Sequence, residues 1–591
     1  MTLPFSENQS FDQLPKYRAP DQDREALVSP CLLGLIDRAA AKSHRSQHAF
    51  DATRAAKLFP VTSSAQVNDG RNDSLLGSAD STLRLGSRSL EQVRHTARLD
   101  TIRAAIRHTE SYRDLWFDKE AYIAQSGAQP WLVAGHQPEL FHPGVWFKNF
   151  LLSRAGSQTG AVPLNLIIDN DLCRAPSIRV LTQGGLGSDP LRTESVMFDA
   201  PSAAVAWECR PLVDRGLFDS FPSRVRASLM DHVRHPLVDR LWIHARNASR
   251  QTGRLGLIIA QARHALEGEL GLQTLELPLS QLCEQSSFAC FSLELLRQLP
   301  RFHQIYNSKR AEYRTANGIR SESHPVQALT EKHAWLEAPW WVYRSDTPAR
   351  KRLFAKLSGG NLLLSDQSGW QATIEGPLDE DDAVAQWQEF AVDGVLLRPR
   401  ALITTMFVRM VVSDLFMHGI GGGKYDQLTD AIIREFFSVD APPMCVATAT
   451  LKLPLAAEVV GGSLVENRTA SQHEIDTLRR LRYHPEEHVA APDSETQQLL
   501  EAKQEMLRAI PPRGEKWQWH RQITRINQRL ADLNRGAMQE SEQRLQSLSA
   551  HQRQLKLATS RELSFCLFEL PYIADTLQGL AEQQFDRPSA K

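Results

Sequence analysis

The feature that most constrains this chain is a strand, a helix and a second strand between residues 131 and 171. The apolar segment WLVA begins at Trp131, the loop GHQPELFHPG follows it, and an apolar helix, VWFKNFLL, begins at Val145. A second apolar segment, VPLNLII, begins at Val162 and is followed by Asp169-Asn170-Asp171. Parallel strands joined by a crossover helix form a βαβ unit, which is right-handed in nearly all proteins. The pattern therefore predicts an α/β fold with a parallel-sheet core.

A second segment of this kind is expected further along the chain. Residues 394–399 (GVLLRP) are predicted as a strand, residues 404–417 as an almost wholly apolar helix, and residues 418–426 (HGIGGGKYD) as a glycine-rich loop. Ligands of open parallel sheets bind beyond the carboxyl ends of the strands. We therefore expect the loops near His136 and Gly422 to meet at one rim of a single sheet and to enclose a small molecule.

The chain after residue 470 has a helical pattern. Pro511 and Pro512 interrupt it, and a long helix is predicted after them. Its apolar residues alternate spacings of four and three, as in a coiled-coil seam: Trp519, Ile523, Ile526, Leu530, Leu533 and Ala537. A helix that begins at Ser494 can fold back on this seam as an intramolecular antiparallel pair, and a homodimer through the coiled coil is the alternative.

The length of 591 residues predicts more than one domain. We expect an N-terminal segment (1–125) that is partly helical and contains a flexible loop rich in Ser, Asn and Gly. A Rossmann-like core with inserted connecting segments is expected at 126–470, and a helical coiled-coil domain at 471–591.

Composition excludes several classes of protein. The 68 Lys and Arg residues against 69 Asp and Glu give a net charge of -1, which argues against nucleic acid as a partner. The 7 cysteines include no C-x-x-C pair, which favours a reducing compartment. The N-terminus lacks the pattern of a signal peptide, and no apolar run has the length of a membrane span. A cytoplasmic protein without a membrane partner is therefore expected.

The loop at residues 135–144 carries the first candidate site. Gly135 allows a tight turn, and His136, Gln137 and His142 offer polar side chains just before a helix N-terminus. Such an N-terminus attracts anions, so His136 or His142 is expected to stabilise charge on a phosphate or to act as an acid. A structural turn whose histidines bond to the backbone is the alternative.

Asp169 and Asp171 form the second candidate site. On an extended backbone both carboxylates would point to one face, with Asn170 between them. Two such groups can bind an amine, a cation or ribose hydroxyls, and one of them can serve as a base. A solvated turn is the alternative. No third ligand at a regular spacing accompanies the pair, so no metal site is predicted.

The glycine-rich segment with Gly421, Gly422, Gly423 and Lys424 is the third candidate site. It does not fit a Walker A loop, because its glycine spacing differs and Tyr425 stands where that loop has Ser or Thr. Its glycines still allow a ligand to approach the backbone closely, and Lys424 beside Asp426 offers a charged pair. A helix-breaking turn is the alternative.

Taken in order, these segments resemble the bacillithiol biosynthesis cysteine-adding enzymes. Residues 135–138 are similar to that family's Gly-Gln-Gln-Pro turn, with His136 in place of a glutamine. Residues 169–171 lie where the family has an Asp-His-Asp type of sequence, with Asn170 in place of the histidine. Residues 421–423 are similar to a glycine-rich loop of the family, from which Lys424 and Tyr425 depart.

The resemblance implies a cytoplasmic ligase that joins an amino acid, cysteine in that family, to an amino-sugar conjugate through an amide. In this scheme His136 and the backbone of 421–423 stabilise negative charge, and Asp169 or Asp171 orients the amine or accepts its proton. ATP or another nucleotide is the expected cofactor, although the residues do not decide whether it is consumed. A non-catalytic nucleotide- or sugar-binding protein with a coiled-coil interaction module and a nucleotidyltransferase are the alternatives.

Overall fold

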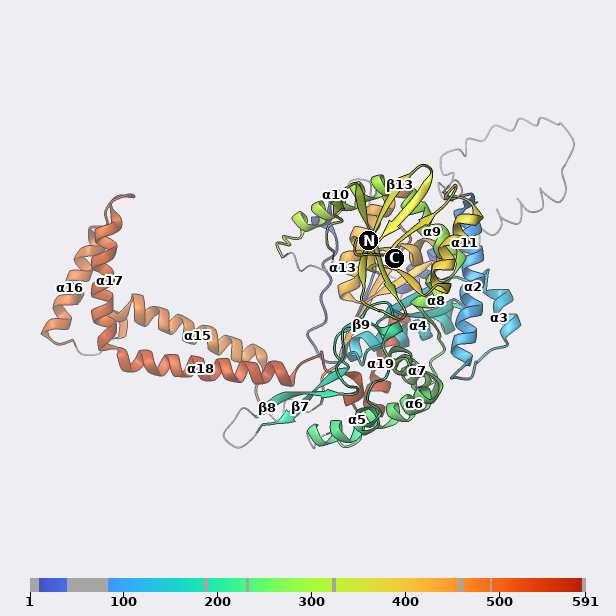
Figure 1. The fold of residues 1–591 in the computed structure, drawn as a ribbon. Coiled ribbons are helices and arrows are strands. Elements are labelled where there is room, and N and C mark those ends of the chain that lie inside the picture. Colours follow the sequence, from blue (N-terminus) through green and yellow to red (C-terminus); the bar gives the residue numbers. More distant parts are fainter. Residues whose placement is uncertain are drawn as a thin grey trace, which may run out of the picture.

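Residues 10–39, 83–184, 190–229, 233–321, 326–454, 461–488 and 492–586 are described by a computed structural model. They form a large body and a helical arm that projects from it (Figure 1). Most of the predicted Ser-, Asn- and Gly-rich loop lies outside the described residues. None of the described helices combines the length and the apolar character that a membrane crossing needs.

A six-stranded sheet forms the centre of the body, in the order β1-β18-β17-β4-β5-β10. Five strands run parallel, and β1 pairs antiparallel with β18 at one edge. The strands are β1 (Glu25–Ser29), β4 (Trp131–His136), β5 (Val162–Ile167), β10 (Leu275–Pro278), β17 (Leu415–His418) and β18 (Met444–Thr450). The predicted parallel βαβ unit is thus confirmed, as β4, the following helix α4 and β5.

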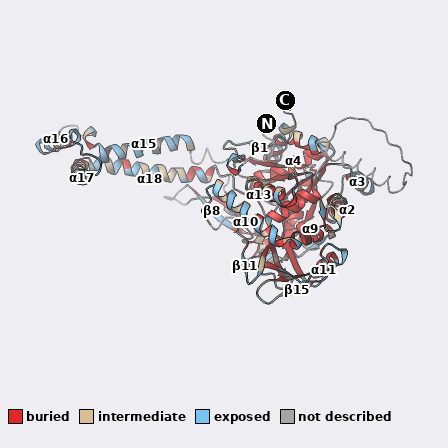
Figure 2. Cartoon of the chain, turned by 90° about the horizontal axis from the view of Figure 1, so that it is seen from above, coloured by how far each residue is buried: buried red, intermediate tan, exposed pale blue. Residues whose placement is uncertain are grey.

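Helices cover both faces of this sheet, because both faces are apolar. Trp131 and Val133 pack into one hydrophobic cluster, and the alternate residues Leu132 and Ala134 pack into the other. The first cluster contains α2 (Leu90–Glu110), α9 (Ser286–Arg297), α10 (Leu299–Ala316), α12 (Ala401–Phe407) and α13 (Ile420–Phe437). The second contains α4 (Pro143–Thr159), α5 (Arg215–Ser228), α6 (Val238–Gln251), α7 (Leu255–Glu269) and α19 (Leu570–Asp586). The residues coloured as buried lie in the interior of the body in Figure 2.

A second sheet is antiparallel. Its strands are β11 (Glu331–Lys332), β12 (Trp335–Arg344), β13 (Lys351–Ser358), β14 (Asn361–Ser365), β15 (Gln371–Ile374) and β16 (Val395–Pro399), which pairs with β12. The strand predicted at 394–399 is therefore present, but it belongs to this sheet and not to the parallel one.

The helix predicted at 404–417 is wrong in its second half. Helix α12 passes into a π-helical turn at Val408–Val412, and β17 follows at Leu415–His418. Most residues of this stretch are apolar, and a short apolar run cannot be assigned to a buried helix or a buried strand from periodicity alone.

Shorter elements connect the main ones. The short helices are η1 (Phe11–Gln13), α3 (Lys119–Ser126), η3 (Trp207–Cys209), α8 (Leu279–Cys283), α11 (Asp381–Val392) and η6 (Phe565–Leu567). The two-stranded pairs are β2 (Arg84–Leu85) with β3 (Arg88–Ser89), β6 (Leu172–Cys173) with β9 (Val205–Ala206), and β7 (Ser177–Gln183) with β8 (Leu191–Met197).

The arm consists of two helix pairs. Its helices are α15 (Leu464–Tyr483), α16 (Ser494–Arg508), α17 (Lys516–Leu533) and α18 (Arg535–Ala558), with η5 (Pro485–His488) between the first two. Helix α15 packs against α18, and α16 packs against α17. The single long helix predicted after Pro512 is interrupted at Asn534, whose side-chain amide donates to the carbonyl of Pro485. Gly536 follows and weakens helix propensity at the same place.

Both ends of the described chain pack onto the body. Strand β1 and helix α2 come from the predicted N-terminal segment, and they contact β18 and β10 of the main sheet. After the arm the chain returns to the body, where α19 packs against α4. The prediction of three separate domains stays a prediction, although the contacts tie parts of the first and third segments to the second.

Candidate functional site

The strand order of the main sheet reverses between β4 and β17. From β4 the chain adds β5 and then β10 on one side, and from β17 it adds β18 on the other. Helix α4, which follows β4, belongs to the second hydrophobic cluster, and α13, which follows β17, contributes to the first. The two connections therefore leave the rim toward opposite faces, which is the arrangement that opens a crevice for ligands in such sheets.

Two histidines mark this rim. Met417 of β17 pairs with Ala134 of β4, so the next residues, His418 and Gly135, end neighbouring strands, and His136 follows Gly135. The predicted loops around His136 and Gly422 thus begin at adjacent strand ends, as expected from the sequence.

His136 is a partly buried imidazole. Its Nδ1 lies 3.2 Å from the carbonyl oxygen of Gln137, and its ring contacts that of Phe141 edge-on. Burial, together with the nearby charge of Lys148, lowers the pKa of His136 to about 3, so the ring is neutral at pH 7. A neutral ring can donate or accept a hydrogen bond, but it does not supply positive charge to an anion.

Lys148 supplies that charge, and the sequence analysis did not single it out. It lies on α4, is 3% exposed, and donates from Nζ to the carbonyl of Gly135 at 3.0 Å. Burial lowers the pKa of Lys148 to about 8, and its charge in turn lowers the pKa of His418 as well as that of His136. An ammonium has three donors, so two remain after Gly135. A single lysine inside the apolar helix VWFKNFLL was the signal that could have revealed it.

His142 caps a helix and does not face the crevice as an anion-binding group. Its Nδ1 accepts from the backbone N–H of Gly144 at 3.1 Å, at the start of α4. Gly144 is buried, and a methyl group added there would overlap the carbonyl oxygen of Ala449. Strand β18 therefore covers the N-terminus of α4, and for His142 the structural alternative is correct. Burial also lowers the pKa of His142 to about 4.

Asp169 and Asp171 diverge, contrary to the expectation of a shared face. Strand β5 ends at Ile167 and the chain turns at residues 169–170, so the alternation of an extended strand no longer applies. Asp169 accepts from the N–H of Ser280 at 2.9 Å and from its hydroxyl at 2.5 Å. Asp171 accepts from Nε2 of Gln137 at 3.0 Å and lies 3.3 Å from Arg350.

Asp169 is the more perturbed of the two carboxyls. Burial raises its pKa to about 7, and the neighbouring carboxylate of Glu208 contributes, against the two hydrogen bonds from Ser280. Asn170 is also buried, and its side chain donates to the carbonyl of Pro399 at 2.8 Å. Asp169 and Asn170 thus join the end of β5 to its neighbours, while Asp171 remains partly exposed at the rim.

The second sheet reaches the same rim through two arginines that stack on Trp341. Arg350 lies 4.8 Å and Arg400 lies 4.4 Å from the centre of the ring. Arg350 also donates to the carbonyl of Asn170 at 2.8 Å. Gln137, Asp171 and Arg350 are thereby linked from three separate segments.

The predicted glycine-rich loop is the first part of helix α13, and this corrects the sequence analysis. Gly419 is the N-cap, and Gly421, Gly422 and Gly423 are helical. A Cβ at 422 would lie 2.6 Å from Nδ1 of His418, and one at 423 would overlap Val446. These two glycines let α13 pack closely on the strand ends. At Gly421 no atom lies within 4 Å of an added Cβ, so this glycine leaves open space.

Lys424 and Asp426 do not form the predicted pair. Lys424 is exposed. Asp426 is buried, and its Oδ2 lies 2.7 Å from Nε2 of His418 and 2.7 Å from Arg409. Its Oδ1 accepts from the hydroxyl of Thr405 at 2.6 Å. These partners hold the pKa of Asp426 well below its usual range despite its burial, so Asp426 fixes the His418 ring by a charged hydrogen bond.

One group of side chains has the composition of a metal site: His264, Glu267 and Glu276 on α7 and β10. Arg263 lies 2.7 Å from Glu267 and 2.6 Å from Glu276. This buried guanidinium supplies the positive charge that a metal would supply, so the group is an ion-pair network of the core.

No protein-family model matches the chain, and no curated protein matches it either.

Proposed function

We propose that this chain is a carbon–nitrogen ligase that joins an amino acid to an amino-sugar conjugate, in the manner of the bacillithiol family that its motifs resemble. The proposal takes the main sheet as a Rossmann-like core and the arm as an antiparallel coiled coil. The order β10-β5-β4-β17-β18, with helices on both faces, supports the first assignment. The paired helices α15 with α18 and α16 with α17 support the second.

The observation that carries the proposal is the parallel pairing of β4 with β17, which places His136, Lys148 and His418 at one rim. The N-terminus of α13 begins at this rim and has no side-chain cap in the structure. Its backbone N–H groups and the two unused donors of Lys148 provide an environment for negative charge.

The proposed roles follow from these contacts. The amine nitrogen of one substrate forms a bond to an activated carboxyl carbon of the other, and the activating group leaves with the bonding electron pair. Asp171 orients the amine and accepts its proton, while Gln137 and Arg350 hold the carboxylate in place. Lys148 and the first N–H groups of α13 stabilise the oxyanion. Asp169 is already bonded to Ser280, so it positions the end of β5 and does not react.

A nucleotide is the cofactor that this scheme implies, and its chemistry would be the activation of the carboxyl group. The uncapped start of α13, with open space at Gly421, fits a phosphate group. We place the activity in the cytoplasm, in keeping with seven cysteines that are all free thiols.

The test is an assay with cysteine, glucosaminyl-malate and ATP, read by mass spectrometry of the amide. Asp171→Asn and Lys148→Met are each expected to lower kcat/KM by about 100-fold or more. Asp440→Asn and Lys556→Met make the same changes at exposed positions outside the rim and are expected to keep full activity.

Other outcomes would replace the proposal. Stabilisation by a nucleotide without any turnover would indicate a binding protein, and release of pyrophosphate without an amide would indicate a nucleotidyltransferase. An amide formed equally well by Asp171→Asn and Lys148→Met would remove the rim from the mechanism.

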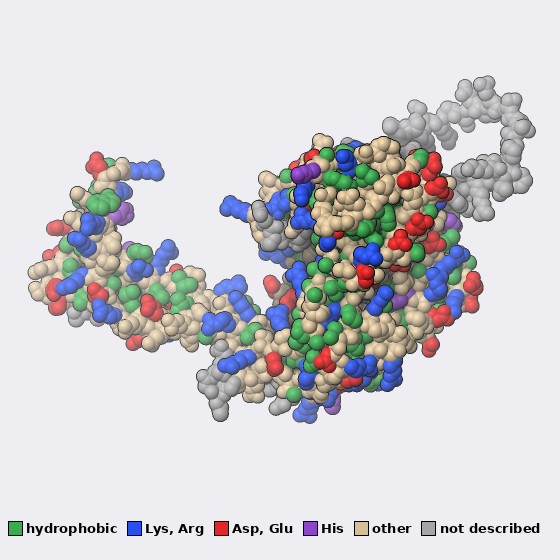
Figure 3. Space-filling view, in the orientation of Figure 1, with side chains coloured by type: hydrophobic (Ala, Val, Ile, Leu, Met, Phe, Trp, Pro, Cys, Tyr) green, Lys and Arg blue, Asp and Glu red, His purple; other side chains and the backbone are tan. Residues whose placement is uncertain are grey.

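We also propose that the arm mediates a homodimer. Its helices already pair within one chain, yet apolar side chains on it stay exposed, among them Val465 at 76% and Trp517 at 68%. Figure 3 shows apolar side chains between mixed basic and acidic ones along the visible face of the arm. An exposed apolar surface of this kind is typical of association.

A further inference from the structure

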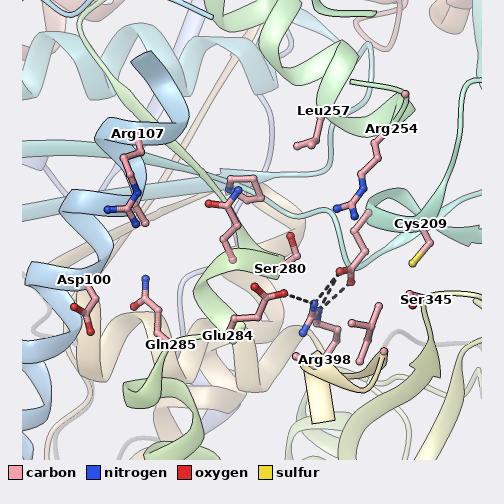
Figure 4. Close-up of a pocket in the computed structure, with 18 of the residues that line it drawn as sticks. Asp100, Arg107, Cys209, Arg254, Leu257, Ser280, Glu284, Gln285, Ser345 and Arg398 are labelled. Carbon is pink, nitrogen blue, oxygen red and sulfur yellow. Dashed lines mark hydrogen bonds and ion pairs between the residues drawn. The ribbon is translucent and has the colours of Figure 1, made fainter. Parts of the chain in front are cut away.

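A cavity of about 1170 Å³ lies beyond the carboxyl end of β10, and none of the residues singled out in the sequence lines it. Four parts of the fold line it: helix α2, the segment from η3 to the start of α7, the segment from the end of β10 through α8, and the second sheet with its flanking loops. Figure 4 shows Arg107 projecting from α2 on one side and Arg254 on the opposite side, with Ser280, Glu284 and Arg398 between them. The volume is slightly above the usual range of sites for small organic ligands, so a ligand of that class fits with room for water.

One wall is a single face of α2. Asp100, Arg103, Ala104 and Arg107 line the cavity, and their spacing of three and four residues places them on one side of the helix. The facing wall begins at Arg254, which is the N-cap residue of α7 and has no side-chain cap of its own. The positive end of this helix is therefore directed toward the cavity.

The charged groups on the floor of the cavity, one arginine and two carboxylates, bind one another. Arg398 is buried and binds Glu208 with two bonds of 3.0 Å, from Nε to Oε1 and from Nη2 to Oε2. Its Nη2 also lies 3.3 Å from Glu284, and the hydroxyl of Tyr343 donates to Glu208 at 2.5 Å. These groups use most of their hydrogen-bond donors and acceptors on one another, so little binding capacity remains for a ligand.

The arginines of the walls differ from Arg398. In the described part of the chain, the guanidinium groups of Arg103, Arg107 and Arg254 have no hydrogen bond or ion pair. Asp100 is the one carboxylate on the same walls that does not take part in the floor network. The walls therefore carry an excess of unpaired positive charge. This charge lies on guanidinium groups, whose forked arrangement of N–H donors matches phosphate and carboxylate groups.

We propose that this cavity is a second binding site, which takes a small molecule with a multiply charged anionic group, a phosphate or a cluster of carboxylates. Arg103 and Arg107 bind the anion from α2, and Arg254 binds it from the start of α7. Asp100 is then available to a hydroxyl or amino group of the same ligand. Ser280 lines the cavity and donates both of its hydrogen bonds to Asp169, so the occupied site borders the end of β5.

The test is calorimetric titration of the full chain at low salt with pyrophosphate and, separately, with succinate. Saturable binding is expected for the wild type, and tighter binding of one probe identifies its class as the ligand chemistry. The double variant Arg103→Gln, Arg107→Gln and the single variant Arg254→Gln are each expected to weaken binding by about tenfold or more. Arg525→Gln makes the same change on the exposed face of the arm and is expected to keep the wild-type affinity.

Circular dichroism and melting temperature establish that each variant is folded before titration. The proposal is overturned if neither probe binds the wild type, or if Arg525→Gln weakens binding as much as the cavity variants do. Pyrophosphate can also bind at the start of α13, so the cavity is identified by the loss of affinity in its arginine variants and not by binding to the wild type alone. Titration of Asp171→Asn separates the second binding site from the ligase mechanism further, since that variant should bind the probe normally.

Discussion

At the scale of single residues, the rim is built from buried polar groups whose protonation is set by their surroundings. Burial keeps His136 neutral, and Asp426 orients His418. Asp169 is the carboxyl whose pKa is raised to about 7, mainly by burial. Each of these groups depends on contacts between segments that are distant in the chain, so each reports on the integrity of the rim.

Asp169 makes the folded state sensitive to pH in a defined direction. Its pKa is about 7 in the fold, against about 4 in an unfolded chain. Between these values the folded protein holds a proton that the unfolded chain has lost, so the stabilisation by this group is complete at low pH and is lost as pH rises through 7.

The side chain of the Asp169→Asn variant does not titrate. The stability of this variant relative to the wild type should therefore increase as pH rises. We expect the difference in melting temperature, variant minus wild type, to increase by about 2 °C or more from pH 5 to pH 8. Thermal denaturation across this range measures it, with Asp440→Asn as the exposed control. Parallel curves for Asp169→Asn and the wild type would show that the carboxyl is ionised in the fold at both pH values.

The sequence predicted the location of the rim better than its chemistry. The loop at His136 and the end of β5 could be placed from apolar segments that stop at polar residues, because strand ends have that pattern. The single lysine inside the apolar helix could have marked Lys148 as a candidate, but its contact with the carbonyl of Gly135 depends on how the helix packs on the strand. The divergence of Asp169 and Asp171 depended on a turn that extended geometry does not anticipate.

At the scale of elements, helix α13 shows how one segment can be read in two ways. Three successive glycines were predicted as a loop that a ligand can approach closely, yet they form the beginning of a helix. Gly422 and Gly423 are needed there because His418 and Val446 occupy the space of any side chain. Strand β17 was missed because the predicted helix was continued across Ser413 and Asp414, the two polar residues that separate the helical turn from the strand.

This packing predicts opposite effects for two neighbouring substitutions. Gly423→Ala should lower the free energy of unfolding by about 1–3 kcal/mol, because its methyl group overlaps Val446. Gly421→Ala meets open space within a helix and should be neutral or stabilising by up to about 1 kcal/mol. Denaturant unfolding of both variants measures the difference, and equal effects would mean that α13 does not lie against β18.

At the scale of the whole molecule, the arm stands apart from the body and exposes much of its surface (Figure 2). The sequence indicated its helices and their fold-back, because the seam and the two prolines are local signals. The break at Asn534 is set by a contact with Pro485, so a local pattern could not reveal it.

If the arm forms a dimer, its exposed apolar residues should control the association. The wild type is expected to sediment as a dimer at micromolar concentration, and Trp517→Lys should shift it toward the monomer. Val392→Lys removes an apolar side chain that is 85% exposed on the body and serves as the matched control. A monomeric wild type, or equal dissociation by both variants, would contradict the role of the arm.

The pairing of β1 with β18 has a consequence for how the chain is made. Glu25 of β1 lies opposite Thr450 of β18, so β1 leaves the ribosome long before its partner strand. Contacts of such long sequence separation form slowly. Strand β1 therefore stays unpaired until β18 has been made, and an unpaired strand edge favours aggregation during folding.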